Sequence, residues 1–189
     1  MKKLQWDKVR VLVANYCNYK CPFCHNEGQG KTTTKERMSL QSFRRLVDIL
    51  SNQPISEFNI SGGEPFLNED IVDMILYIND NLDCDISCAT NLSLIKPEHI
   101  SVLSGTRIKF NIQFPFATAE AFKQSTVTGN LDRILTNIDL LCAENIQVGL
   151  NTVVQSDDFS SISTLIDFAL ERGLPLKLLP QIGLSGSNQ

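Results

Sequence analysis

Residues 15–28 read Asn15-Tyr16-Cys17-Asn18-Tyr19-Lys20-Cys21-Pro22-Phe23-Cys24-His25-Asn26-Glu27-Gly28 and directly follow a short apolar run. The stretch carries three cysteines in a C-x3-C-x2-C spacing. Thiolates are soft ligands that suit zinc or iron-sulphur clusters, and clusters are held by closely spaced cysteines. A closed structural zinc site needs four ligands. The loop therefore either takes a fourth ligand from elsewhere or leaves one metal position open for a substrate or cofactor.

The other readings of these cysteines are less favourable. A Cys3His zinc knuckle would use His25, which directly follows Cys24 and is poorly placed to bind the same metal. Disulfides are also disfavoured, because six cysteines without a secretory leader indicate a reducing compartment. Cys84, Cys88 and Cys142 lie in apolar segments, and we interpret all three as small buried hydrophobes.

Length and composition limit what this loop is attached to. A chain of 189 residues with 42% hydrophobic content is ordinary for one domain. We expect a core domain over residues 1–180 and a tail or truncated linker over 181–189. The charged N-terminus and the lack of a long apolar run predict a cytoplasmic protein without a membrane span. A net charge of −4 makes nucleic acid an improbable partner.

Strand and helix patterns alternate along the chain. Helices are predicted from apolar residues in helical period, and strands from short apolar runs that turn signals bound. Six such units predict an α/β fold with a parallel sheet and crossover helices, a partial, open (β/α)6 barrel. The predicted strands are 9–14, 58–61, 83–90, 107–114, 146–154 and 176–179, and the predicted helices begin near 40, 69, 97, 131 and 160.

A second motif, Ser61-Gly62-Gly63-Glu64-Pro65, ends the second predicted strand. In barrel-like α/β domains the chemistry collects at the C-terminal ends of strands, and the cysteine loop also follows a strand. Paired glycines let the backbone approach a ligand without a Cβ in the way. The two motifs are therefore predicted to lie close together.

Together these motifs resemble the radical S-adenosylmethionine (SAM) superfamily, whose signature is this cysteine spacing with an aromatic residue before the third cysteine. Phe23 fills that place. The resemblance implies a 4Fe-4S cluster and SAM as cofactors, with SAM on the iron that no cysteine holds. It implies that the glycine-glycine-glutamate motif holds the methionine amino group. The residues concerned are Cys17, Cys21, Cys24, Phe23, Gly62, Gly63 and Glu64.

The resemblance extends to residues at the ends of later strands. It places Thr90 and Asn91 beside the cluster and either SAM or the substrate. Gln113 matches a position where many relatives put a serine against the ribose, and Asn151 matches a polar SAM contact. Leu179 ends the sixth strand, where the family packs an apolar residue on the adenine. The alternative for each is an interior amide or a core hydrophobe.

The activity that the resemblance implies is reductive cleavage of SAM to a 5'-deoxyadenosyl radical. That radical would take hydrogen from an unidentified small-molecule or peptide substrate, with flavodoxin or ferredoxin as electron donor. Two alternatives stay open: an activase that places a glycyl radical on a partner enzyme, and a non-catalytic module with structural zinc.

Within the superfamily the chain looks most like the GTP cyclase that begins molybdenum-cofactor synthesis, with a local similarity to viperin. Arg10 matches a GTP-contacting arginine of the cyclase. Asn59 and Ser156 stand where the cyclase has basic residues on the triphosphate, and the cysteines of its second cluster have no counterpart here. A triphosphate would therefore lose most of its charge complementarity.

Overall fold

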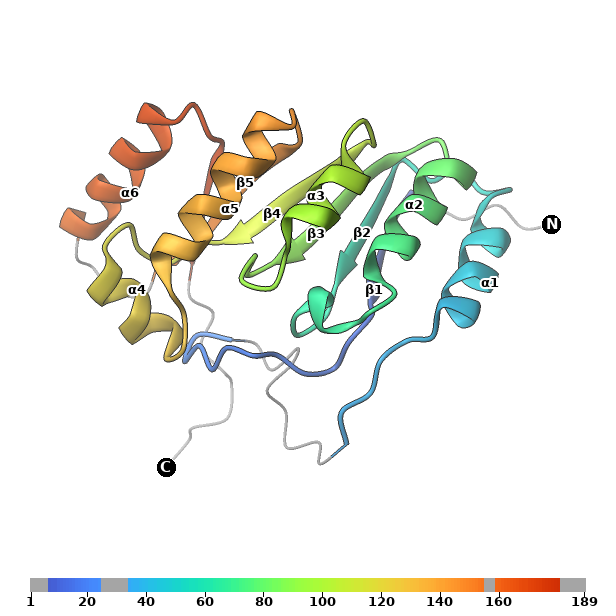
Figure 1. Ribbon diagram of the computed structural model, residues 1–189, viewed down its shortest axis with the longest axis horizontal. Helices are drawn as coiled ribbons and strands as arrows, with labels where there is room; N and C mark the ends of the chain where they lie inside the picture. The colour runs from blue at the N-terminus through green and yellow to red at the C-terminus, as the bar shows by residue number, and fades with distance from the viewer. Residues whose placement is uncertain (1–6, 25–33, 155–158, 181–189) are drawn as a thin grey trace.

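The structure, a computed structural model, describes residues 7–24, 34–154 and 159–180 (Figure 1). In these residues six strands form one parallel sheet in the order β1-β2-β3-β4-β5-β6, with β1 and β6 at its edges. This confirms the predicted partial (β/α)6 barrel. The elements are β1 (Lys8–Leu12), α1 (Leu40–Leu50), β2 (Glu57–Ser61), the 3-10 helix η1 (Pro65–Leu67), α2 (Ile71–Asn81), β3 (Asp85–Thr90), α3 (Pro97–Leu103), β4 (Ile108–Gln113), α4 (Ala119–Thr126), α5 (Leu131–Ala143), β5 (Gln147–Val154), α6 (Phe159–Glu171) and β6 (Leu176–Pro180).

Two helix starts show how local sequence sets the elements. The Ser39 hydroxyl accepts a hydrogen bond from the Ser42 backbone amide at 3.2 Å and caps α1. The Asn130 side chain accepts one from the Arg133 amide at 3.1 Å and caps α5. Each cap satisfies a backbone donor that the helix leaves open, which stabilises the helix by about 1 kcal/mol.

The two faces of the sheet differ in character. Helices cover one face (Figure 1), where the strand side chains Phe58, Ile60 and Phe110 are 0% exposed. Each such side chain stabilises the fold by roughly 1.5–3 kcal/mol. Because side chains alternate along a strand, the intervening residues face the open side, where Arg10 pairs in register with Asn59. The open side is therefore the polar side.

Some expectations need correction. Helix α4 was absent from the sequence prediction, because Phe122 is its one large buried apolar residue and leaves a weak pattern. Cys84 and Cys88 are buried as predicted. Cys142 is exposed, so its assignment to the core was wrong. It lies off the buried face of α5, which consists of Leu131, Ile134, Asn137, Ile138 and Leu141.

Several predicted features lie outside the described residues: His25, Ser156 and the tail over 181–189. Within the described ranges, no helix has the length and apolar character that crossing a membrane requires.

Candidate functional site

A cavity of about 380 Å³ lies at the C-terminal ends of the strands. Its size is within the range of small-molecule sites. Every predicted site residue except Glu64 lines it. These are Cys17, Cys21, Cys24, Phe23, Gly62, Gly63, Thr90, Asn91, Gln113, Asn151 and Leu179. The fold thus brings together residues that are far apart in the sequence.

The glycine motif holds the cysteine loop against β2. The backbone amide of Gly63 donates to the carbonyl of Ala14 at 2.9 Å, and the amide of Glu64 donates to the carbonyl of Tyr16 at 3.0 Å. A Cβ on Gly63 would lie 2.1 Å from the Tyr16 carbonyl oxygen, and one on Gly62 would lie 2.5 Å from that of Ala14. Gly62 also has a φ of +146°, which side chains disfavour. The glycines therefore admit the cysteine loop itself, in addition to any ligand.

Glu64 is fully buried and faces the end of β3, so the cavity lining does not include it. Its carboxylate accepts hydrogen bonds from the Thr90 hydroxyl at 2.7 Å, the Asn91 amide at 2.8 Å and the Phe66 amide at 3.0 Å. Burial raises the pKa of Glu64, and these hydrogen bonds oppose that rise. The Glu64 side chain thus connects the end of β3 to the turn after β2. It stabilises the cysteine loop through this turn and does not line the cavity.

Asn91 carries this support to the first cysteine. Its Nδ2 donates to Cys17 Sγ at 3.7 Å and to Asn18 Oδ1 at 2.9 Å. The Tyr19 backbone amide also donates to Cys17 Sγ, at 3.3 Å. The side-chain Oδ1 of Asn91 accepts hydrogen bonds from the Ser93 amide and hydroxyl, and the Ser93 hydroxyl accepts one from Asn18 Nδ2. Sequence reasoning missed Asn18 and Ser93, which no local pattern distinguishes from ordinary loop residues.

The turn between α4 and α5 anchors the loop from the other side of the site. The Lys20 amide donates to the Thr126 carbonyl at 3.3 Å, and the Thr128 hydroxyl donates to the Asn18 carbonyl at 3.0 Å. Figure 1 shows the blue segment after β1 passing beneath the sheet to this turn. Residues 126–129, which precede the helix predicted to begin near 131, thus position the loop.

The three thiols fit a cluster in their setting and arrangement. Cys17, Cys21 and Cys24 are free thiols on the cavity wall. Burial raises the pKa of Cys17 and raises that of Cys21 to about 12. Bound iron would bring positive charge to the site and favour the thiolates.

The thiols do not converge on one point. In the described part of the chain, no three His, Cys, Asp or Glu side chains lie close enough to hold a single metal ion. A tetrahedral zinc ion draws its ligands to one centre, whereas an iron-sulphur cluster gives each cysteine its own iron. The three thiols are therefore not arranged around one metal ion in the described structure.

The β4 to β6 side of the cavity carries amides and apolar groups. Gln113 Nε2 is buried and has no hydrogen-bond partner among the described residues. Leu179 and Phe23 add apolar surface, and Asn151 pairs in register with Gln113. Buried polar groups are nearly always hydrogen-bonded, so an unsatisfied amide in a cavity indicates a ligand position.

Arg10 is the one charged side chain in the described lining, where no carboxylate occurs. Its Nη2 donates to the Ser61 hydroxyl at 2.8 Å, which joins β1 to the end of β2. Sequence reasoning assigned no site role to Tyr19, Ser61 or Val153, although all three line the cavity. Strand alternation alone would have placed Val153 beside Asn151.

The fold and the site define an open parallel α/β half-barrel with a three-cysteine loop above its strand ends. The chain belongs to the radical SAM superfamily, whose family model matches residues 11–169.

Its relatives agree with that assignment. It is 28% identical to the GTP 3',8-cyclase of Clostridium perfringens over 92% of this chain and 54% of the cyclase. It is 29% identical to a probable GTP 3',8-cyclase of Thermococcus kodakarensis over 90% of this chain and 55% of that protein. The chain thus spans about half the length of these curated relatives.

Solved structures show the same fold. SuiB of Streptococcus suis bound to S-adenosylmethionine has a TM-score of 0.84 at 18% identity, over 95% of this chain and 42% of SuiB. The enzyme anSMEcpe with bound AdoMet has a TM-score of 0.77 at 15% identity, over 96% of this chain and 54% of anSMEcpe.

Proposed function

We propose that this chain is the core of an enzyme that binds a 4Fe-4S cluster through Cys17, Cys21 and Cys24 and cleaves SAM reductively. The observation that carries the proposal is that three free thiols face one cavity lined by polar strand ends and a glycine turn. The bound cluster and SAM supply the chemistry: an electron breaks the sulphonium bond, giving methionine and a 5'-deoxyadenosyl radical that takes hydrogen from the substrate.

The protein's own residues bind and orient. Gly62 and Gly63 line the cavity at the strand end, where the methionine part of SAM would lie beside the cysteine loop. Gln113 and Asn151 offer amide groups to the ribose, and Leu179 offers apolar surface to the adenine. Phe23 is itself buried and places an apolar ring next to the third cysteine in the sequence.

The radical formed by SAM cleavage would act on a small-molecule or peptide substrate. The relatives are named for GTP, and SuiB was solved with a precursor peptide, SuiA. In this chain Asn59 donates to the Ser87 hydroxyl at 2.8 Å, so a neutral, engaged amide stands where the cyclase has a basic residue. We infer a substrate with less negative charge than a nucleoside triphosphate. The proposed electron donor is flavodoxin or ferredoxin, in the cytoplasm.

Anaerobic reconstitution with iron and sulphide tests the proposal. We expect a brown protein that, with dithionite, converts SAM to 5'-deoxyadenosine and methionine. Cys21→Ser should lose both colour and cleavage, whereas Cys142→Ser should keep both, because Cys142 is exposed and far along the chain on α5. A colourless protein that holds zinc tightly would refute the radical mechanism and favour the structural zinc module.

A further inference from the structure

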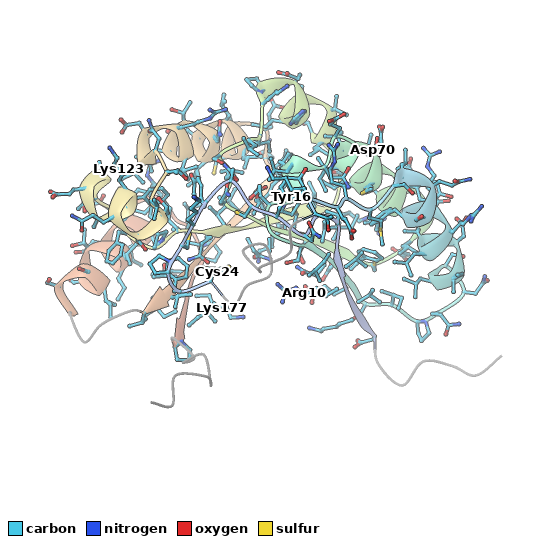
Figure 2. All side chains as sticks on the ribbon, turned by 90° about the horizontal axis from the view of Figure 1, so that it is seen from below. Arg10, Tyr16, Cys24, Asp70, Lys123 and Lys177 are labelled. Atoms are coloured by element: carbon cyan, nitrogen blue, oxygen red, sulfur yellow. The ribbon has the colours of Figure 1, made fainter. Side chains whose placement is uncertain are left out.

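Two lysines on the open face of the sheet lie beside the cavity without lining it. Lys109 in β4 has the same strand parity as Asn111 and Gln113, and it therefore points to the open side. Lys177 in β6 pairs in register with Asn151. Figure 2 shows Lys177 on the same side of the sheet as Arg10 and Cys24, opposite the helices. Both lysines thus border the cavity on its β4 to β6 side.

Gly149 sets the direction of Lys109. Lys109 Cε and Asn111 Oδ1 each lie 3.5 Å from the point where a Cβ of Gly149 would be. Gly149 is in β5, which lies between β4 and β6. The Lys109 stem therefore crosses β5 in the direction of the strand that carries Lys177. A side chain at position 149 would occupy part of this path.

The two lysines form no ion pair in the described ranges, although Glu57 and Asp85 share their face of the sheet and the chain has a net charge of −4. Glu57 on the same face is bound to Lys8 at 3.2 Å and accepts from Ser87. The two lysines place positive charge on β4 and β6, the strands on either side of β5, and an anion bound between them would lower their mutual repulsion.

We propose that Lys109 and Lys177 form an anion subsite that binds a carboxylate or phosphate group of the substrate. The proposal rests on the radical SAM function, because the subsite adjoins the amides that we assign to SAM. Lysine is a compact point charge that accepts either anion without a fixed geometry. The substrate class is therefore a molecule with at least one carboxylate or phosphate, placed so that its reacting carbon reaches the cavity.

Anion binding to the reconstituted, SAM-loaded protein tests the subsite directly. Inorganic phosphate and malonate serve as separate probes, and sodium chloride at equal ionic strength is the reference. A bound anion raises the thermal unfolding midpoint according to its affinity. We expect at least one probe to raise the midpoint above the chloride reference, and the more effective probe indicates the anion class. In the double variant Lys109→Gln, Lys177→Gln we expect at least a fivefold loss of affinity for that probe.

Lys123→Gln is the control, because Lys123 lies on α4 on the helix side of the molecule (Figure 2) and is exposed, as Lys177 is, whereas Lys109 is half-buried. This variant should bind the probes as the wild type does. Unchanged affinity in the double variant, or an equal loss in Lys123→Gln, would overturn the subsite. A parallel loss of SAM affinity in the double variant would also overturn it, since the lysines would then serve SAM. Failure of the wild type to cleave SAM would refute the enzyme function. The anion-binding measurement would still show whether the two lysines bind an anion.

Discussion

The two halves of the site differ in whether their polar side chains have hydrogen-bond partners within the protein. In the half built by β1 to β3, buried Glu64, Thr90 and Asn91 all have hydrogen-bond partners within the protein. In the half built by β4 to β6, the buried Gln113 amide and Lys109 have none among the described residues. Partnered buried groups hold a structure in place, whereas unpartnered ones are costly unless a ligand satisfies them. The first half therefore supports the cysteine loop, and we propose that the second is a surface for ligands.

Gly63→Ala should have the largest effect, because Gly63 lies where the turn after β2 contacts the cysteine loop. The new Cβ would lie 2.1 Å from the Tyr16 carbonyl oxygen and 2.9 Å from the Cys17 amide nitrogen. Both are backbone atoms, so the loop must move. We expect a loss of about 3 kcal/mol or more in the free energy of unfolding, measured by urea denaturation, and little reconstituted iron.

Gly149→Ala is the matched control on the ligand side. Its Cβ would meet ordinary contacts at 3.5 Å, so stability and iron content should stay near wild type. An equal loss of stability and iron content in Gly63→Ala and Gly149→Ala would contradict the proposed difference between the two halves of the site.

Glu64→Ala should come next. It removes the acceptor shared by the Thr90 hydroxyl and the amides of Asn91 and Phe66, all buried. A buried donor without a partner costs about 1–3 kcal/mol. For the three donors together we expect the free energy of unfolding to fall by about 3 kcal/mol. Glu64→Gln keeps an acceptor oxygen and should cost less. Denaturation curves for both variants decide this, and equal stability of the two would show that the carboxylate is not the tie between β2 and β3.

The sequence predicted the arrangement of elements better than the support of the site. Apolar runs and helical periods located all six strands, because burial of one helix-covered face imposes those patterns. Strand ends also located the cavity. The tie from Asn91 to Cys17 spans 74 residues, and no local pattern encodes a contact at that separation. Helix α4 and exposed Cys142 were misjudged because their apolar patterns are weak or ambiguous.

Asn91→Ala should affect the cluster more than the fold. It removes the side-chain donor at 3.7 Å from Cys17 Sγ and the acceptor that Ser93 uses. A hydrogen bond to a ligating sulphur stabilises the more negative, reduced cluster, so its removal should make the reduction potential more negative. The unfolding free energy should fall by about 1 kcal/mol. An EPR-monitored redox titration measures the first effect and urea denaturation the second.

Ser93→Ala separates the two effects of Asn91. Its hydroxyl contacts Asn91 and Asn18 but makes no hydrogen bond to Cys17. This variant should lose a similar amount of stability and keep the wild-type potential. A shifted potential in Ser93→Ala and not in Asn91→Ala would contradict the assigned role of the Asn91 amide.

Gln113→Leu should give the opposite pattern, because Gln113 belongs to the ligand side. The variant removes a buried Nε2 without a partner in the described structure, so stability should be unchanged or slightly higher. SAM affinity should fall by about 1 kcal/mol, or roughly fivefold, since one hydrogen bond to the ligand is lost. Calorimetric titration of SAM into the reconstituted protein measures this. A destabilised variant with normal SAM affinity would show that Gln113 stabilises the fold and does not bind SAM.

His99 should give the smallest effect, at the outer rim of the supporting half. Its ring stacks on Phe66 of η1 with centroids 5.7 Å apart, and its Nδ1 accepts from the Lys96 amide at 3.3 Å. Burial lowers the pKa of His99 below the ordinary value of 6.5, and the Lys96 charge adds to this. The folded state therefore prefers the neutral ring.

The sign of the pH dependence follows from that preference. The contribution of His99 to stability is fully present above about pH 6.5 and is lost as the pH falls through the lowered pKa, because the unfolded state then binds the proton more readily. The wild type should lose stability relative to His99→Gln as the pH is lowered from 7 to 5, in urea denaturation at each pH. Using the difference between the two proteins removes the titration of His25 and of the carboxylates, which both share. Parallel profiles would show that the pKa of His99 does not change on folding, which would contradict the effect that we assign to its burial.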